Sequence, residues 1–161
     1  MIILSIVGKS NTGKTTLIEK LVPVLVGSGL RVAVVKHAQS GFELDIEGKD
    51  SDRIFKAGAD VAIVSESKIA LIQRGGDLNK VIGFLSDYDL ILTEGFSKEK
   101  YPKIALDDGG YENVVFRYKG NFQDLLEFIV KMIEKMKHHW SSSEKIANVS
   151  PKEVESHKKA E

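Results

Sequence analysis

The sequence predicts an α/β protein with three layers, in which helices cover both faces of a mostly parallel sheet and an antiparallel hairpin extends it. An apolar strand pattern over residues 2–7 runs into a glycine-rich turn and then into a helical pattern. Strand and helix patterns continue to alternate after it, as they do in parallel βαβ units. The alternation is broken by two short apolar runs, 61–64 and 69–72, separated by four polar residues. This break predicts the hairpin.

The remaining elements follow from apolar periodicity and from turn residues. Helical spacing covers residues 15–27, and an apolar run predicts a buried strand over 31–35. Asp50 or Ser51 is expected to cap a short helix that ends at Ala57. The later elements expected are a helix started by Asp77, strands over 89–94, 103–106 and 114–116, and a helix opened by Asn121 with an apolar face that reaches Met136.

The turn after the first strand is a complete phosphate-binding loop, Gly8-Lys9-Ser10-Asn11-Thr12-Gly13-Lys14-Thr15. Successive backbone N–H groups in such a turn, and at the helix start that continues with Thr16, cradle a β-phosphate. The Lys14 ammonium reaches the β- and γ-phosphates, and the Thr15 hydroxyl can hold Mg²⁺. The alternative is a glycine-rich turn that merely joins a strand to a helix. The loop predicts a P-loop NTPase-type fold whose phosphate-binding residues are Gly8, Asn11, Thr12, Gly13, Lys14, Thr15 and Thr16.

Length and composition set the outer limits. With 161 residues, we expect one nucleotide-binding domain over 1–138 and a polar, flexible tail over 139–161. Lys plus Arg and Asp plus Glu both number 23, which argues against a general nucleic-acid binder. The absence of cysteine excludes disulfides and thiolate metal sites. The apolar start is short and lacks a basic leader, so we expect a cytoplasmic protein with no membrane partner.

Two acids are candidates for positioning Mg²⁺ and the attacking water. Glu94 ends an apolar strand and precedes Gly95, the placement of the second acidic motif in P-loop folds. The alternative for Glu94 is a capping acid on a loop. Asp45 lies in the long polar segment 36–49, where it could hold Mg²⁺ directly or through water. A solvated loop acid is the alternative for Asp45.

Cationic residues beside the loop are candidates for binding phosphate or a second ligand. Lys36 and His37 end the second strand, and a hydrogen-bonded structural histidine is the alternative for His37. Arg53 could neutralise transition-state charge or act only in a surface ion pair. Lys9 resembles the second loop lysine of the partitioning ATPases and nitrogenase iron-protein relatives, which reaches across a dimer; a solvated lysine is the alternative. The catalytic candidates are therefore Lys14, Glu94 and Lys9.

More selective strings follow the phosphate loop in a fixed order over residues 1 to about 106. They are Lys36-His37, Gly48-Lys49-Asp50-Ser51-Asp52-Arg53, Ala57-Gly58-Ala59, Glu94-Gly95-Phe96 and Pro102-Lys103-Ile104. Together with the loop, they resemble the molybdopterin-guanine dinucleotide biosynthesis protein B family (MobB). Further histidines often follow Lys-His in that family, whereas Ala38, Gln39 and Ser40 stand here.

The resemblance implies a GTP-binding, weakly hydrolysing homodimer that serves the guanylyltransferase joining GMP to molybdopterin. It implies that Lys14 and Thr15 bind the GTP phosphates and Mg²⁺, and that Glu94 and Asp45 complete the metal and water shell. It also makes four residues candidates for phosphate or pterin contacts: Lys36, His37, Arg53 and Lys103.

The choice of base and of reaction stays open at this level. Asn79-Lys80 is followed by Val81-Ile82, so it is not the Asn-Lys-x-Asp element that reads guanine, and ATP is not excluded. The alternatives to a GTP-binding adaptor of molybdenum-cofactor biosynthesis are a P-loop small-molecule kinase or ligase that uses ATP, and a non-catalytic nucleotide-dependent interaction module.

Overall fold

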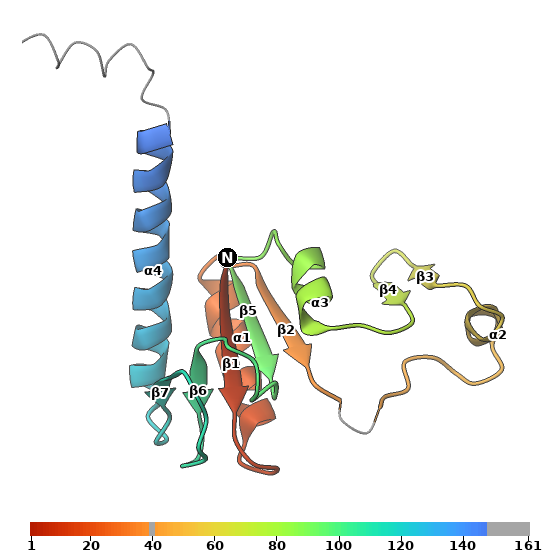
Figure 1. Ribbon diagram of the computed structural model, residues 1–161, viewed down its shortest axis with the longest axis horizontal. Coiled ribbons are helices and arrows are strands. Elements are labelled where there is room, and N and C mark those ends of the chain that lie inside the picture. Colours follow the sequence, from red (N-terminus) through yellow and green to blue (C-terminus); the bar gives the residue numbers. More distant parts are fainter. Residues whose placement is uncertain (39–40, 148–161) are drawn as a thin grey trace, which may run out of the picture.

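A five-stranded parallel sheet forms the centre of the computed structural model, which describes residues 1–38 and 41–147, with side chains as far as Met136. The strand order is β2-β5-β1-β6-β7, and every neighbouring pair is parallel. The elements in chain order are β1 (Ile2–Val7), α1 (Lys14–Gly27), β2 (Val32–Lys36), α2 (Asp50–Lys56), β3 (Val61–Val64), β4 (Ile69–Ile72), α3 (Leu78–Phe84), β5 (Leu90–Glu94), β6 (Lys103–Ala105), β7 (Val114–Arg117) and α4 (Phe122–Ala147). The predicted α/β class is confirmed (Figure 1).

Helices cover the two faces of the sheet unequally. α1 and α4 pack on one face in a single apolar cluster, to which the sheet contributes Leu4, Leu92 and Ile104, all fully buried. The other face carries the seven-residue helix α3 and the connection 95–102 between β5 and β6. These layers give the three-layer arrangement that the sequence predicts, with β1 and β5 at its centre.

The face under α3 also carries a buried polar row. The register places Ser5 opposite both Thr93 and Lys103, and all three side chains have no exposed surface. The Thr93 hydroxyl donates to Ser5 Oγ over 2.8 Å. Buried polar groups are stable only when they are hydrogen-bonded, and this pair meets that condition. The polar row lies directly beneath the connection between β5 and β6.

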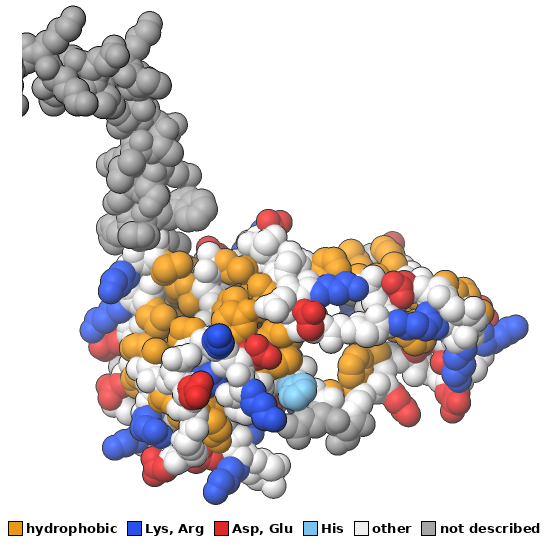
Figure 2. Space-filling model, viewed as in Figure 1, with side chains coloured by type: hydrophobic (Ala, Val, Ile, Leu, Met, Phe, Trp, Pro, Cys, Tyr) orange, Lys and Arg blue, Asp and Glu red, His pale blue; other side chains and the backbone are white. Residues whose placement is uncertain are grey.

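Residues 41–76 reach away from the sheet and are called the arm below (Figure 1). α2 has no buried residue, and β3 and β4 pair with each other as an antiparallel sheet of two strands. The space-filling view shows apolar side chains over the surface of the arm (Figure 2). Val64 and Ile69 are 71% and 77% exposed. The predicted hairpin is therefore present, as a small sheet separate from the parallel one.

Most predicted elements are found within one or two residues of their expected ends. Asp77 caps α3, because its side chain accepts a hydrogen bond from the Lys80 N–H over 2.9 Å. The N-cap of α2 is Lys49 rather than Asp50 or Ser51, so that prediction was wrong by one residue. α4 continues past the predicted domain boundary at 138 and ends at Ala147. The rest of the predicted tail, 148–161, lies outside the described residues.

None of the helices in the described part of the chain combines the length and the apolar character that crossing a membrane requires.

Candidate functional site

The phosphate loop connects β1 to α1 at the carboxyl edge of the sheet, and its backbone shape depends on two small residues. Gly13 has a φ of 86°, a left-handed conformation that glycine adopts readily. A Cβ on Gly8 would lie 2.5 Å from Thr12 Oγ1 and 3.3 Å from Leu106 Cβ, so a larger residue there would force Thr12 to move. The loop therefore turns tightly enough to place its backbone against a ligand.

Side chains of the loop hold its own carbonyl oxygens. Lys14 Nζ donates to the carbonyls of Gly8 and Lys9 over 3.0 and 2.7 Å, and Thr12 Oγ1 donates to the Lys9 carbonyl over 2.9 Å. Among the described residues, no acceptor is bonded to the N–H groups of Lys14, Thr15 and Thr16 at the start of α1. Free N–H groups at a helix start attract anions.

Glu94, at the end of β5, links the loop to β2. Its Oε1 accepts a hydrogen bond from Thr15 Oγ1 over 2.9 Å, and its Oε2 lies 3.8 Å from Lys36 Nζ. The register explains this meeting, because Glu94 lies between Ile6 of β1 and Lys36 of β2. The side chain is only 13% exposed, so the surrounding strands fix its position.

A hydroxyl beside a carboxylate fits Mg²⁺. Mg²⁺ prefers oxygen ligands, uses few protein side chains, and completes its shell with phosphate oxygens and water. The described residues contain no group of three or more His, Asp or Glu side chains that would form a metal cage. Thr15 and Glu94 would therefore hold Mg²⁺ only together with a bound phosphate.

His37 and Phe96 form an aromatic wall next to Glu94. Their rings stack with centroids 4.7 Å apart, and the His37 N–H donates to the Glu94 carbonyl over 3.0 Å. Gly95 has a φ of 92°, and a Cβ there would lie 3.1 Å from His37 Cβ. Gly95 thus permits the close approach that sets the stacking geometry.

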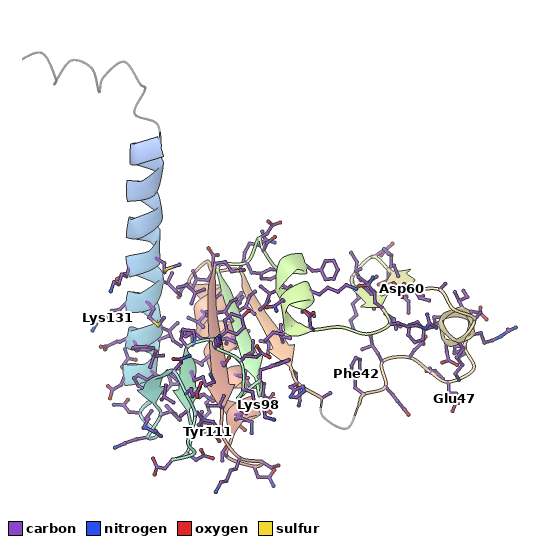
Figure 3. The ribbon with its side chains drawn as sticks, viewed as in Figure 1. Phe42, Glu47, Asp60, Lys98, Tyr111 and Lys131 are labelled. Carbon is purple, nitrogen blue, oxygen red and sulfur yellow. The ribbon has the colours of Figure 1, made fainter. Side chains whose placement is uncertain are left out.

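These groups line a cleft of about 1200 Å³ that runs from the phosphate loop towards α3 and the start of the arm. Lys98 and Tyr111 lie at the loop end of the sheet, and Phe42 extends from the arm (Figure 3). Such a volume exceeds what the phosphates of a nucleotide need, so the ribose and base or another ligand would also find room there. Lining residues that carry polar groups include Lys9, Ser10, Lys14, Lys36, His37, Gln73, Ser97, Lys98 and Glu99.

The structure does not bring Asp45 and Arg53 to this cleft. Both belong to the arm, and neither lines the cleft. The Arg53 guanidinium is 74% exposed and lies 4.0 Å from the Asp50 carboxylate, which matches the surface ion-pair alternative. Asp45 Oδ1 accepts from the Ile46 N–H over 2.8 Å, while its buried Oδ2 has no partner among the described residues. A metal role for Asp45 stays a prediction.

Lys103 is buried, whereas its predicted contact with phosphate or pterin requires a side chain that faces the cleft. Its side chain is fully buried, and Nζ donates to the carbonyls of Glu99 and Tyr101, the latter over 3.2 Å. Burying an ammonium is unfavourable unless hydrogen bonds compensate, and these carbonyls do so. Lys103 therefore holds the connection between β5 and β6 in place rather than facing the cleft.

The backbone of Lys9 makes a contact that the sequence did not predict. The Lys9 side chain is exposed, in accord with the solvated alternative, whereas its N–H donates to Asp107 Oδ2 over 2.7 Å. Asp107, Phe96 and Tyr111 were not among the predicted site residues. The available signal for Asp107 was its place just after a strand, before Gly109 and Gly110.

Comparisons with known proteins place the chain in a family. Residues 3–122 match the family model described as molybdopterin guanine dinucleotide synthesis protein B. Curated relatives named molybdopterin-guanine dinucleotide biosynthesis adapter protein include those of Haemophilus influenzae, 38% identical over 65% of this chain and 62% of the relative, and Escherichia coli, 42% identical over 60% of each. A putative adapter protein of Methanocaldococcus jannaschii is 31% identical over 80% of this chain and 61% of the relative. The chain thus spans about three fifths of the length of these relatives.

Solved structures show the same fold over most of the chain. A crystal structure of molybdopterin-guanine biosynthesis protein B (mobB) is 35% identical and has a TM-score of 0.64, over 83% of this chain and 99% of that one. Bacillus subtilis MobB has the same TM-score of 0.64 at 26% identity, over 81% of this chain and 97% of that one.

Proposed function

Since the chain belongs to the molybdopterin guanine dinucleotide synthesis protein B family, we propose that it is a GTP-binding adaptor with weak GTPase activity in molybdenum-cofactor biosynthesis. The observation that carries the proposal is the Thr15–Glu94 hydrogen bond of 2.9 Å beside the phosphate loop. It joins a phosphate-binding turn to an acid on a neighbouring strand. The names of the curated relatives support the adaptor role.

Each loop residue has a definite task in this proposal. The N–H groups at the start of α1 would bind phosphate oxygens, and Lys14 would supply a positive charge to the β- and γ-phosphates. Thr15 and Glu94 would hold Mg²⁺, which neutralises phosphate charge when bound. The two oxygens of Glu94 face the Thr15 hydroxyl and the Lys36 ammonium, which keeps the carboxylate directed at the phosphate loop.

Nucleotide titration tests the proposal. Wild-type protein with Mg²⁺ is expected to bind GTP more tightly than ATP, and Lys14→Ala should weaken binding by about a hundredfold or more. Lys20→Ala, an exposed lysine on the same helix, is the matched control and should bind normally. Glu94→Gln should lower the hydrolysis rate and leave binding nearly unchanged. Normal binding by Lys14→Ala would refute the phosphate-loop assignment.

A small-molecule kinase or ligase that uses ATP is the second candidate, because the cleft of about 1200 Å³ leaves room beyond the phosphates. The same titration separates the two functions. Fast phosphoryl transfer to a small acceptor, or tight ATP binding without a GTP preference, would replace the adaptor proposal. Addition of molybdopterin and a guanylyltransferase should raise the GTP hydrolysis rate if the protein is an adaptor, and should leave the rate unchanged if it is a kinase or ligase.

The proposal includes a homodimer in the cytoplasm. The apolar surface of the arm supports self-association, since Val64, Ile69 and Leu71 are all at least half exposed. Lys9 would reach the partner's phosphates only if the dimer brings the two loops together. Sedimentation should give a dimer for wild-type protein and a monomer for Ile69→Asp. A monomeric wild-type mass at micromolar concentration would dispose of the dimer.

A further inference from the structure

The peptide groups on either side of Lys9 are fixed by hydrogen bonds from three directions. Its carbonyl accepts from Lys14 Nζ over 2.7 Å and from Thr12 Oγ1 over 2.9 Å. Its N–H donates to the carboxylate of Asp107 over 2.7 Å, across 98 positions of sequence. The first two bonds lie within the loop, whereas the third ties the loop to the end of β6.

Asp107 is itself held by its neighbours. Its Oδ1 accepts from the Gly109 N–H over 3.0 Å, and its carbonyl accepts from Arg117 Nη1 over 3.0 Å. The bond from the Lys9 N–H is the main cause of a lowered pKa for the Asp107 carboxyl, followed by the Gly109 N–H, while the nearby Tyr111 hydroxyl and the Lys9 charge lower it further. The carboxylate is therefore charged and oriented at neutral pH.

Packing along β1 and β6 keeps this contact in register. The Leu106 N–H donates to the Val7 carbonyl over 2.9 Å, one residue before Gly8 and one before Asp107. A Cβ on Gly8 would lie 3.3 Å from Leu106 Cβ, so these two segments of the chain are in close contact. The end of β6 thus supports the start of the phosphate loop through both backbone and side chain.

We propose that Asp107 is a positioning residue of the nucleotide site, whose carboxylate fixes the Lys9 N–H and through it the Lys14 ammonium. A charged acceptor on one peptide N–H orients that segment of the loop, and the carbonyls of Gly8 and Lys9 on either side of that N–H both accept from Lys14 Nζ. Losing the carboxylate frees the start of the loop and misplaces the lysine that meets the phosphates. This inference rests on the nucleotide binding proposed above.

The neighbouring Asp108 offers a matched control. Its carboxylate is fully exposed and pairs only with Arg117, over 3.4 Å, among the described residues. Asp107→Ala is expected to raise the Kd for Mg²⁺-GTP by about tenfold, and Asp107→Asn, which keeps one acceptor oxygen, by about threefold. Asp108→Ala should stay within about twofold of wild type.

The resonance of the Lys9 amide supplies a readout that a general loss of stability would not move. In nucleotide-free protein, a carboxylate acceptor shifts the Lys9 amide proton downfield. Asp107→Ala should abolish this shift, Asp107→Asn should reduce it, and Asp108→Ala should leave it unchanged. Dispersed amide spectra establish that each variant is folded.

Two results would overturn the inference. One is a Lys9 amide shift that Asp107→Ala leaves unchanged, and the other is wild-type Mg²⁺-GTP affinity in Asp107→Ala despite an altered shift. Failure of wild-type protein to bind either GTP or ATP would instead refute the proposed function, and with it the role assigned to Asp107 in the nucleotide site. The nucleotide-free amide spectrum still reports on the Asp107 hydrogen bond itself, so the two failures are distinguishable.

Discussion

The parallel sheet and the arm use apolar residues in opposite ways. In the sheet, Leu4, Leu90 and Leu92 have no exposed surface, and two helices seal the same face. In the arm, helix α2 has no buried residue, and Ile69 is 77% exposed. The phosphate loop and Glu94 both lie at the edge of the sheet, where Lys14 and Glu94 are held by hydrogen bonds to the loop. Thus the groups proposed to bind phosphate are pre-organised by the sheet, whereas the arm has apolar surface available for contact with another molecule.

Removing one apolar side chain from each region should give the largest contrast. Leu92→Ala is expected to lower the free energy of unfolding by about 3 kcal/mol, because it opens a cavity in a packed interior. Ile69→Ala removes the same number of carbon atoms from the arm and should change the free energy of unfolding of the monomer by less than about 0.5 kcal/mol. Urea denaturation measures both. Similar losses for the two variants would mean that the arm is as tightly packed as the sheet.

A buried lysine tests how the core supports the wall of the cleft. Lys103→Met should lower the free energy of unfolding by about 2 kcal/mol, since the carbonyls of Glu99 and Tyr101 lose their buried donor. Hydrogen exchange at Ser97 and Lys98 should quicken at the same time. The control is Lys100→Met, an exposed lysine of the same connection, which should alter neither quantity. Unchanged exchange in Lys103→Met would contradict the role assigned to Lys103.

The smallest effect is expected in the arm, as a dependence on pH. The Gly48 N–H, 2.8 Å from Asp52 Oδ2, and then Lys56, 2.9 Å away, hold the pKa of the Asp52 carboxyl below its ordinary value of 3.8. A folded pKa below the unfolded one adds stability above the unfolded value, and this stability disappears as the pH falls through the folded pKa.

Amide protection in α2 should therefore be constant from neutral pH down to about pH 4 and should fall below it. Asp52→Asn should show lower protection at pH 7 and a flatter profile. Asp50→Asn, whose carboxylate is 97% exposed, serves as the control and should behave as wild type. An acid-induced loss that persists in Asp52→Asn would have to come from another group.

The sequence was informative where a pattern is local, and misleading where a role depends on register. The loop and Glu94 could be predicted, because each directly follows an apolar run that had to be a central strand. Asp107 could not, since its contact with Lys9 depends on β6 pairing with β1. The family resemblance made Lys103 a candidate for a phosphate or pterin contact, whereas its burial depends on the pairing of β6 with β1, which the sequence alone does not show. The polar composition of residues 41–56 did not reveal that they lead away from the phosphate loop and carry Asp45 and Arg53 with them.

The hydrogen bonds from Lys103 to the connection between β5 and β6 affect which substitutions the cleft can accept. Its ammonium bonds to backbone carbonyls, which every amino acid possesses, and not to the side chains of Glu99 and Tyr101. Exposed side chains in 97–100 can therefore be exchanged without undoing this anchor. Libraries randomised at Ser97, Lys98 and Glu99 should retain the fold while altering the chemistry that the cleft presents. The exposed side chains of this connection can therefore vary in sequence while Lys103 keeps the backbone beneath them in place.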